Sequence, residues 1–331
     1  MTNSTPAAAP VLDIRDLRVQ FATRDGAVPA VVGLSLTVAA GEIVGLVGES
    51  GCGKSTTALA TMRLLPPYAR ITGQIRVDDL DLVPLSEGEM RRIRGERVAM
   101  IFQDALAALD PTMTVGRQIM EPLTIHLGMS GNAAQQRAIE LLDLVGIPSP
   151  ASRMRQHPHE FSGGMRQRVM IATALACNPH LLLADEPTTA LDVTVQRQIL
   201  NLLLGLRAEM GAGIVLITHD VGVVGEICDR VVVMYAGREV ESGPTEAVFT
   251  QPRHPYTHGL LGSTLDATQD RDTPLRAIPG LPPDLAHLPA GCVFAPRCPL
   301  ATEVCRQQEP PLVQVAPGQQ SACWHWQEVA A

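Results

Sequence analysis

The spacing of apolar residues along the chain predicts which segments form strands and which form helices. Short apolar runs bounded by turn residues predict buried strands at 11–14, 31–38, 43–47, 97–102, 181–184, 214–217 and 230–235. Apolar residues repeated at helical intervals predict helices at 54–65, 116–127 and 132–145, with Asn132 as the N-cap of the third, and a further helix after Asp192. Strands that alternate with helices in this way predict an α/β fold.

The alternation is interrupted once and stops before the end of the chain, which indicates how the chain is organised. Residues 103 to about 178 contain no convincing strand and predict a helical insertion. Residues 251–331 hold 12 of the 26 prolines and show little periodicity, so they predict a separate extension. We therefore expect a main domain at 1–250, with a helical subdomain at about 103–178 and antiparallel strands at its edge, followed by the extension at 251–331.

Composition and charge narrow the class of protein. With 331 residues and 46% hydrophobic content, the chain can bury a large core. No apolar run reaches the roughly 18 residues of a membrane-spanning helix, and residues 1–10 lack the pattern of a signal peptide. We therefore expect a soluble cytoplasmic protein that reaches a membrane only through a protein partner. The net charge of −8 offers no basic field for phosphate backbones, so nucleic acid is not an expected partner.

One segment matches the phosphate-binding pattern G-x-x-x-x-G-K-[ST] at every fixed position: Gly48-Glu49-Ser50-Gly51-Cys52-Gly53-Lys54-Ser55. It lies between a predicted strand and a predicted helix, as a phosphate loop requires. Its glycines allow backbone N–H groups to turn towards phosphates, Lys54 supplies a cation, and Ser55 supplies a hydroxyl ligand for Mg²⁺. Together with Thr56 at the start of the helix, the segment predicts a binding site for ATP or GTP.

A pair of carboxylates follows the buried strand predicted at 181–184. Open α/β sheets bind ligands at the carboxyl ends of their strands, where Asp185 and Glu186 stand. Asp185 is placed to hold Mg²⁺, and Glu186 is placed to polarise an attacking water as general base. On its own this pair is also typical of an ordinary turn at a helix start, but the phosphate loop in the same chain favours nucleotide hydrolysis.

The segment Phe161-Ser162-Gly163-Gly164-Met165 resembles the LSGGQ signature of ATP-binding-cassette (ABC) ATPases, with Phe161 and Met165 replacing the first and last residues. Ser162, Gly163 and Gly164 stand at a predicted helix start, which favours an anion. The resemblance implies a P-loop NTPase fold with a RecA-like core, an antiparallel β subdomain and a helical insertion. It also implies a head-to-tail dimer, in which the signature of one subunit, Met165 included, closes over ATP held by the phosphate loop of the other.

The same resemblance gives roles to further residues. Gln103 corresponds to the Q-loop glutamine that reaches Mg²⁺ and the attacking water. Asp192, in Ala190-Leu191-Asp192, corresponds to the D-loop at the dimer interface, and His219 to the switch histidine at the γ-phosphate. Their order and spacing carry these assignments, because each residue type alone is more often structural. Phe21 has two equal interpretations: it stacks on adenine, or it points inward from a strand.

Two longer segments, 162–172 and 185–196, resemble the dipeptide/oligopeptide permease ATPases, and most of all the first of their two paralogues. His254-Pro255-Tyr256-Thr257 and the extension strengthen this resemblance to the peptide and nickel importer branch. It implies a paralogous second ATPase, with a homodimer left open, two transmembrane permease subunits and an extracytoplasmic solute-binding protein. It also implies a place at the cytoplasmic face of the membrane. Peptides, nickel chelates and opines all stay open as cargo.

A soluble ABC ATPase that acts on nucleic acid or ribosomes would share the same motifs. DNA-repair members insert long coiled coils and translation factors carry two cassettes in tandem, and this sequence has neither. Intact Glu186 and His219 argue against a regulator that binds nucleotide without hydrolysing it. An importer ATPase is therefore the preferred hypothesis.

Four of the seven cysteines lie in the extension: Cys292, Cys298, Cys305 and Cys323. Their spacing is not that of common zinc fingers, and disulfides are not expected in a cytosolic chain, so the residues alone leave free thiols, Zn²⁺ and iron–sulfur open. The family resemblance points to a [4Fe–4S] cluster. His325 is an alternative ligand in place of Cys323.

Overall fold

The computed structural model describes residues 9–24, 26–188, 191–263 and 278–329. Contacts between Cα atoms divide the chain into two compact units that alternate along the sequence. The first, here called the helical unit, consists of Met1–Leu12, Thr37–Glu42 and Arg76–Val215. The second, the phosphate-loop unit, consists of Asp13–Leu36, Ile43–Ile75 and Leu216–Ala331. The C-terminal extension therefore belongs to the same unit as the predicted phosphate loop.

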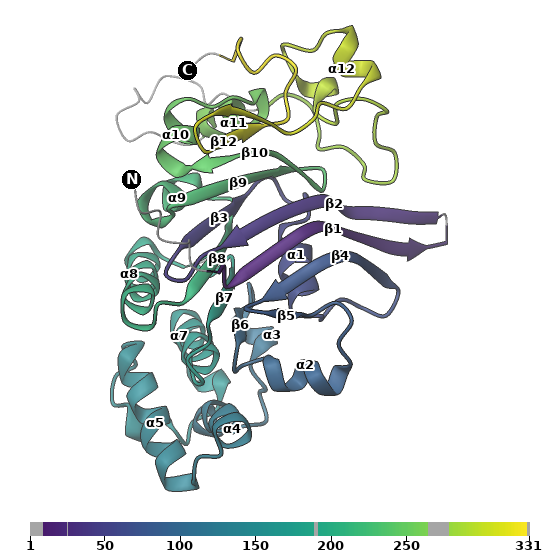
Figure 1. The fold of residues 1–331 in the computed structure, drawn as a ribbon. Helices are drawn as coiled ribbons and strands as arrows, with labels where there is room; N and C mark the ends of the chain where they lie inside the picture. The colour runs from purple at the N-terminus through teal and green to yellow at the C-terminus, as the bar shows by residue number, and fades with distance from the viewer. Residues whose placement is uncertain (1–8, 25, 189–190, 264–277, 330–331) are drawn as a thin grey trace, which may run out of the picture. The chain divides into compact units, whose positions relative to one another are not determined.

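The phosphate-loop unit contains a sheet whose strands come from distant parts of the chain. β3 (Ile43–Val47), buried along its whole length, pairs in parallel with β9 (Arg230–Tyr235). β10 (Arg238–Pro244) runs antiparallel to β9 and is followed by β12 (Gln319–Ser321) and β11 (Val313–Ala316). In Figure 1 the arrows of this unit change from purple through green to yellow in the same order. The extension thus adds strands to the sheet.

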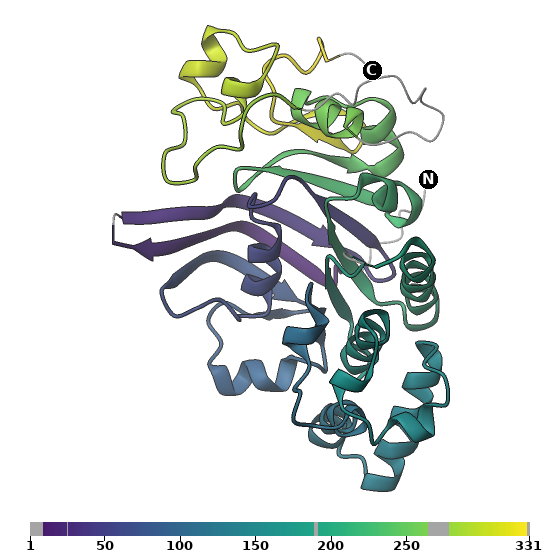
Figure 2. The ribbon, with the colours of Figure 1, turned by 180° about the vertical axis from the view of Figure 1, so that it is seen from behind.

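A second set of strands contains β2 (Gly26–Val38), β1 (Leu12–Thr23) and β4 (Ala69–Val77), in that order. β1 and β2 are long neighbours whose arrows point in opposite directions, as Figure 2 shows from behind. On β1, buried Leu17 and Val19 alternate with exposed neighbours, as expected for a strand with one face in the core. The opposite directions of β1 and β2 agree with the antiparallel strands that the sequence predicted.

The helices of the phosphate-loop unit are short: α1 (Lys54–Thr61), α9 (Val221–Ile227), α10 (Thr245–Thr250), α11 (Pro255–Gly262), the 3-10 turn η2 (Ala295–Arg297) and α12 (Glu303–Gln307). The predicted end of the first helix at Leu65 is wrong. α1 stops at Thr61, because Arg63 adopts a left-handed conformation with φ of 52°, through which a right-handed helix cannot continue. The extension contains helices and strands that its weak periodicity did not indicate.

The core of the helical unit contains two parallel strands. β6 (Val98–Ile101) pairs with β7 (Leu181–Asp185), and both are fully buried. α8 (Val193–Met210) begins after Asp192, whose side chain accepts a backbone hydrogen bond at the helix start. β8 (Gly213–Thr218) is divided between the two units. The buried strands bring their polar C-terminal ends to one edge, where the carboxylate pair stands.

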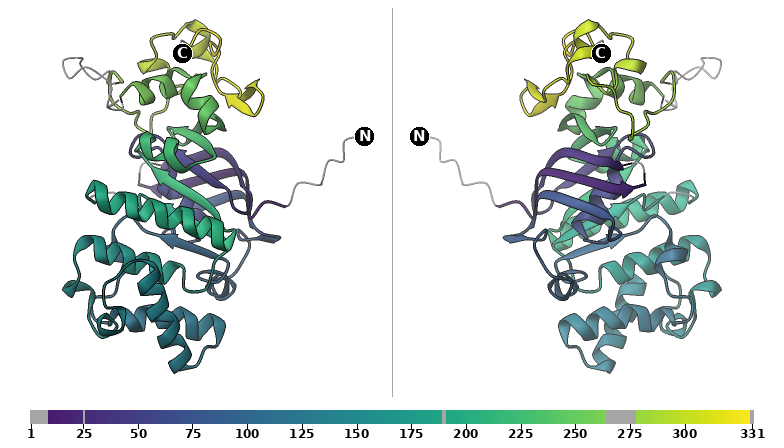
Figure 3. Two further views of the ribbon diagram at one scale, coloured as in Figure 1. Left: turned by 90° about the vertical axis from the view of Figure 1, so that its left-hand side faces the viewer. Right: turned by 90° about the vertical axis from the view of Figure 1, so that its right-hand side faces the viewer.

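The rest of the helical unit consists mainly of helices: α2 (Glu87–Ile93), α3 (Ala105–Ala108), α4 (Val115–Leu127), α5 (Gly131–Leu144), α6 (Pro150–Arg153), the 3-10 turn η1 (Pro158–Glu160) and α7 (Gly163–Ala174). The short strand β5 (Leu80–Asp81) pairs with the end of β4. α4, α5 and α7 contact one another and form a teal group in Figure 3. The N-cap of α5 is Ser130, not Asn132, because the helix already begins at Gly131. Among the described helices, none has the length and apolar character needed to cross a lipid bilayer.

A buried aromatic cluster packs the extension against the sheet of the phosphate-loop unit. The ring centroid of Tyr235, at the end of β9, lies 4.6 Å from that of Tyr256 in α11 and 5.2 Å from that of Phe294. Tyr256 and Phe294 are 5.4 Å apart, and His254 packs on Phe294 at 5.7 Å. Burial lowers the pKa of His254 to about 3, so its ring is neutral. The chain has only three tyrosines, so two of them in this cluster give the extension a true core.

Candidate nucleotide site

The turn between β3 and α1 requires the glycines of the phosphate-binding pattern. Gly48 and Gly53 have φ angles of 149° and 104°, which residues with side chains rarely adopt. A Cβ on Gly48 would lie 2.2 Å from the carbonyl oxygen of Met234, and one on Gly53 would lie 2.5 Å from that of Ala30. Contact with neighbouring backbone therefore explains these glycines independently of any ligand.

The ammonium group of Lys54 lies against this turn. The residue is only 5% exposed, and Nζ donates to the carbonyl oxygens of Gly48 at 2.7 Å and Glu49 at 2.9 Å. Cys52 Sγ lies 3.6 Å from the same nitrogen, and burial raises the pKa of this thiol, so it stays neutral. A buried cation held by neutral carbonyl oxygens favours an incoming anion such as a phosphate.

The start of α1 adds the end of a helix to the loop. α1 has no acidic residue in its first turn, so the partial positive charge of its N-terminus is available to an anion. Ser55 and Thr56 are half-buried in this turn, whereas Ser50 and Gly51 are exposed in the loop before it. Loop, lysine and helix start thus meet in one place, as the sequence pattern predicts.

Two residues of the extension hold the loop at Glu49. The backbone N–H of Glu49 donates to the Tyr256 hydroxyl at 2.8 Å, and its carboxylate accepts from both terminal nitrogens of Arg297, at 2.6 and 3.0 Å. The Arg297 side chain is 5% exposed, and its hydrogen bonds to Glu49 raise the pKa of the guanidinium. Sequence reasoning missed both partners, which stand 207 and 248 residues from Glu49 and belong to no recognised motif of the site.

In the helical unit, the structure brings Gln103 and Glu186 together. β6 and β7 are parallel with Ile101 opposite Ala184, so the residues that follow each strand emerge at the same edge. Gln103 Nε2 donates to Glu186 Oε2 at 2.9 Å, and Asp185 is 5% exposed at the end of β7. Glu186 has a φ of 47°, an unusual left-handed conformation that directs its side chain differently from a regular strand residue. The sequence prediction named all three polar residues but not the hydrogen bond between Gln103 and Glu186.

The signature segment forms the start of α7. Ser162 is the N-cap, and its Oγ accepts from Met165 N at 3.4 Å. Ser162 and Gly163 are exposed, while Gly164 and Met165 are half-buried. Further along α7, buried Gln167 donates through Nε2 to the carbonyl oxygen of Pro187 at 2.8 Å. This bond, which the sequence gave no reason to expect, ties the signature helix to the turn that carries Glu186.

The remaining predicted site residues are a helix N-cap, a residue after a strand and a residue on a strand. Asp192 is exposed as the N-cap of α8, and Ala190 of the same motif lies outside the described residues. His219 is exposed after β8, in the phosphate-loop unit. Phe21 is half-buried on β1, and its ring lies 6.1 Å from that of Tyr68 in a tilted arrangement. This position leaves both interpretations of Phe21 in place.

The four cysteines of the extension do not fit a metal site as arranged. Cys292 N–H donates to Cys305 O at 2.7 Å, and Thr302 Oγ1 lies 3.5 Å from Cys305 Sγ and 2.8 Å from His325 Nε2. Nevertheless, no three Cys, His, Asp or Glu side chains in the described ranges lie close enough together to hold a metal ion. None of the four forms a disulfide, and burial raises the pKa of Cys323 to about 12. The structure therefore does not support the predicted Zn²⁺ or [4Fe–4S] site.

Family models define the class of protein to which this fold and these sites belong. A model described as ABC transporter matches residues 31–189, and one described as oligopeptide/dipeptide transporter, C-terminal region, matches residues 240–305. The first match includes the phosphate loop, the signature and Glu186. The second includes Tyr256 and Arg297, so the residues that hold Glu49 lie within a recognised C-terminal region.

Full-length relatives narrow the class further. The chain is 50% identical over 323 residues to the oligopeptide transport ATP-binding protein OppD of Salmonella typhimurium, a match that covers 98% of this chain and 96% of that protein. It is 51% identical over 308 residues to OppD of Bacillus subtilis, with 92% and 86% covered. The chain belongs to the ATP-binding proteins of ABC transporters, in the oligopeptide/dipeptide branch.

Solved structures confirm the ABC ATPase fold predicted from the signature motif. The dimeric ATP-binding cassette MJ0796, in a post-hydrolysis state bound to ADP and phosphate, aligns with a TM-score of 0.64 and 29% identity, covering 71% of this chain and 98% of that one. CbiO1 from Clostridium perfringens, part of an ABC transporter complex, aligns with a TM-score of 0.61 and 27% identity, covering 73% and 92%. The α/β fold expected from the apolar pattern is correct.

Proposed function

We propose that this chain is the ATP-hydrolysing subunit of a membrane importer for dipeptides or oligopeptides. The observation that carries the proposal is the 50% identity to an oligopeptide transport ATP-binding protein over 98% of the chain. The cargo named for that relative favours peptides over nickel chelates or opines. We assign residues 1–250 to the nucleotide-binding cassette, with the helical subdomain at about 103–178, and residues 251–331 to the extension.

We assign the hydrolytic step to Glu186 as general base. Its carboxylate receives the side-chain N–H of Gln103, which supports a shared role for the two groups in orienting the attacking water. His219 contacts the γ-phosphate in this assignment, and the loop residues Gly48–Thr56 hold the nucleotide. The family resemblance supports the grouping of these residues around one nucleotide.

Mg²⁺ would be held by oxygen donors: Ser55, Gln103 and Asp185. A hydroxyl, an amide oxygen and a buried carboxylate suit this hard cation, which prefers oxygen ligands. When bound, Mg²⁺ neutralises charge on the β- and γ-phosphates. Phe21 is the stacking partner that we propose for adenine; the residue is half-buried, and its ring lies 6.1 Å from that of Tyr68.

The exposed signature supports a dimer that closes on ATP. Ser162 and Gly163 are exposed at the N-terminus of α7, a 12-residue helix, so they present an anion-binding end to another molecule. Asp192 is also exposed, as a D-loop residue at a dimer interface would be before assembly. The solved relative MJ0796 is dimeric. We propose a paralogous ATPase as partner, with a second copy of this chain as the alternative.

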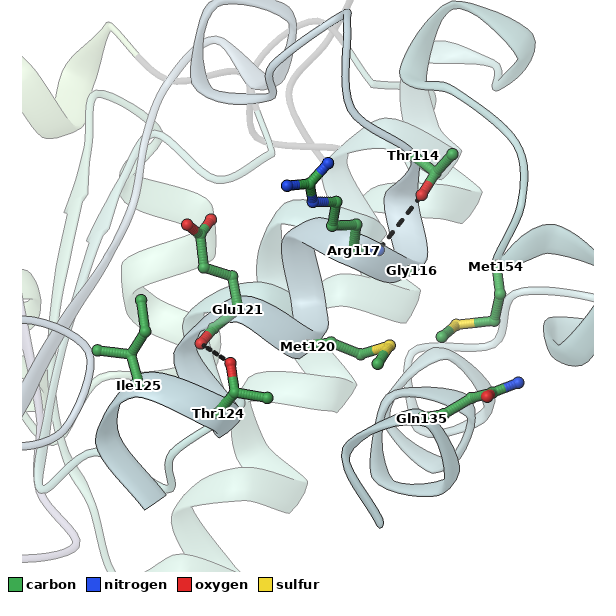
Figure 4. A pocket seen from close by; sticks show the side chains of 9 residues that line it. All are labelled: Thr114, Gly116, Arg117, Met120, Glu121, Thr124, Ile125, Gln135 and Met154. Atoms are coloured by element: carbon green, nitrogen blue, oxygen red, sulfur yellow. Dashed lines mark hydrogen bonds between the residues drawn. The ribbon is translucent and has the colours of Figure 1, made fainter. Parts of the chain in front are cut away.

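A pocket in the helical unit supports docking on permease subunits. It has a volume of about 490 Å³ and is lined mainly by α4, with contributions from Gln135 of α5 and from Met154. Figure 4 shows Met120 and Met154 facing one another across it, with the charged ends of Arg117 and Glu121 pointing away from the two methionines. Methionine-lined surfaces adapt to apolar side chains. We propose that a helix of a transmembrane permease subunit docks here.

This docking would place the chain at the cytoplasmic face of the membrane, with two permease subunits and an extracytoplasmic solute-binding protein completing the importer. Ile125→Asp tests the docking surface, because Ile125 lines the pocket and is 68% exposed. We expect loss of permease capture with unchanged ATP binding. Leu144→Asp on α5 is the matched control, since Leu144 is 44% exposed and does not line the pocket.

Reconstitution separates the importer from its soluble rival. The full chain is co-expressed with a peptide permease and its partner ATPase and placed in proteoliposomes, and ATP hydrolysis is measured with and without peptide-loaded binding protein. Stimulation of hydrolysis together with peptide uptake supports the importer. Absence of stimulation, with co-purification of ribosomes or nucleic acid instead, supports a soluble ABC ATPase.

A metal site in the extension remains a hypothesis from the family resemblance alone. Anaerobic purification of the full chain, followed by iron, zinc and acid-labile sulfide analysis, tests it. About four irons and four sulfides per chain would establish the [4Fe–4S] cluster, and one Zn²⁺ the alternative. A metal-free chain with the extension folded would refute both.

A further inference from the structure

The phosphate loop is held from outside by the C-terminal extension. Arg297 makes two hydrogen bonds to the Glu49 carboxylate, at 2.6 and 3.0 Å, in the forked geometry that gives Arg–carboxylate pairs their strength. The Tyr256 hydroxyl accepts the Glu49 backbone N–H at 2.8 Å. One loop residue is thereby fixed through both its side chain and its backbone.

Arg297 is itself held firmly. Its Nε donates to Pro279 O at 2.8 Å, one terminal nitrogen contacts Ile278 O at 3.3 Å, and the other contacts the Tyr235 hydroxyl at 3.3 Å. The side chain is 5% exposed, so each of these bonds is shielded from water. A guanidinium with so many fixed partners cannot follow Glu49 if the loop moves; it restrains the loop instead.

The support beneath Tyr256 is equally firm. Its ring packs at 4.6 Å on Tyr235 and 5.4 Å on Phe294, and the residue is completely buried. The extension also lies along the loop, because residues 282–285 line a cavity of about 350 Å³ together with residues 49–52. The extension therefore supports the loop through two bonds and a neighbouring segment.

The inner side of the loop is held differently. Lys54 Nζ bonds the carbonyl oxygens of Gly48 and Glu49, and these bonds compete with any phosphate that Lys54 contacts. A lysine that turns to an anion gives up bonds that hold the loop closed on itself. The bonds from Tyr256 and Arg297 do not involve Lys54, so they remain when it turns.

From this geometry we infer that Arg297 and Tyr256 are positioning residues for nucleotide binding, which act through Glu49 to keep the phosphate loop in its binding shape. The inference rests on the proposed ATP binding at this loop. It gives the extension a role in the nucleotide site that does not depend on any metal.

A purely structural role is the competing explanation, and the chain offers a matched control for it. Arg238 of β10 forms a second forked pair with Glu309 of the extension, at 2.7 and 3.3 Å. This pair also ties the extension to the sheet but does not touch the phosphate loop. If Arg297 merely anchors the extension, loss of either arginine should affect ATP binding alike.

The test measures the dissociation constant for ATP with Mg²⁺ by calorimetry on the full chain, with thermal unfolding recorded for every variant. We expect Arg297→Met and Glu49→Gln each to weaken ATP binding about tenfold, and the double variant to be no weaker than either, because the two residues act as a unit. Arg297→Lys should recover part of the affinity. Arg238→Met should bind ATP as wild type does.

Several outcomes would overturn the inference. Equal affinities for Arg297→Met and wild type would do so, as would equal losses in Arg297→Met and Arg238→Met. If Arg297→Met does not fold, Tyr256→Phe serves as the test, because it removes only the hydroxyl that accepts the Glu49 N–H. We expect this variant to bind ATP about threefold more weakly than wild type. Wild-type affinity would refute the positioning role. A wild-type chain that binds no ATP would instead refute the proposed function.

Discussion

The two polar centres of this chain are built in opposite ways. In the phosphate-loop unit, Lys54 bonds the loop from inside and Arg297 from outside, and Gly48 fits directly against neighbouring backbone. In the helical unit, Gln103 is exposed, Glu186 is half-buried, and a 2.9 Å side-chain hydrogen bond joins them. A group of fixed shape, such as a phosphate, is bound best by a rigid loop, whereas side chains that must exchange partners during a reaction need freedom.

The largest effect on stability and ATP binding is expected at Gly48, where a side chain has least room. Gly48→Ala places a Cβ 2.2 Å from Met234 O at a φ of 149°, so the loop must move. We expect a loss of about 2 to 4 kcal/mol in unfolding free energy. ATP binding, measured by calorimetry, should disappear. Gly131→Ala is the control, because nothing lies within 4 Å of the added Cβ, and its unfolding free energy should equal that of wild type. Equal unfolding free energies of the two variants would mean that the loop is not rigid.

Glu186→Gln separates catalysis from binding. The substitution keeps the size of the side chain and removes the proposed general base, so turnover of the assembled ATPase should fall about a hundredfold or more. The dissociation constant for ATP should not rise, because the phosphate loop is unchanged. A steady-state phosphate-release assay measures the first and calorimetry the second. Turnover at the wild-type rate would place the base elsewhere.

Lys54→Ala should impair ATP binding itself, in contrast to Glu186→Gln. Removing the buried ammonium group takes away a charged partner for the phosphates, so the dissociation constant for ATP should rise about thirtyfold. Thermal unfolding should change little in comparison with Gly48→Ala, because alanine is compatible with the start of α1. Unimpaired affinity would contradict the assignment of the phosphate loop itself.

Gln103→Ala should have the smallest effect. The side chain is exposed and its bond to Glu186 is open to competition from water, so turnover should fall about fivefold to tenfold. ATP affinity should stay within about twofold of wild type. A loss as large as that of Glu186→Gln would show that the helical-unit centre is as rigidly organised as the phosphate loop.

Local patterns predicted much of this structure. β9 spans the predicted residues 230–235, and β3 spans 43–47, because short apolar runs between turn residues leave little choice of boundary. The phosphate loop was predictable because its glycines adopt backbone angles that residues with side chains rarely adopt. Gln103 was predicted as a site residue only through the order of the family's motifs, whereas Glu186 was also predicted from its place at the carboxyl end of a buried strand.

Other features depend on contacts that no local pattern records. The early end of α1 follows from the left-handed conformation of Arg63, a residue type that gives no such signal. The strand pair β11–β12 was missed because three or four residues are too few to show a period. The bond from Arg297 to Glu49 joins residues 248 apart in sequence, so only the folded chain brings it about.

That separation has a consequence for how the protein is made. The ribosome synthesises Glu49 first, and Arg297 follows only 248 residues later. A nascent chain therefore carries its phosphate loop without the outer support until Arg297 has been added. Full support of the loop is reached only after the extension has been synthesised as far as Arg297 and has folded against the loop.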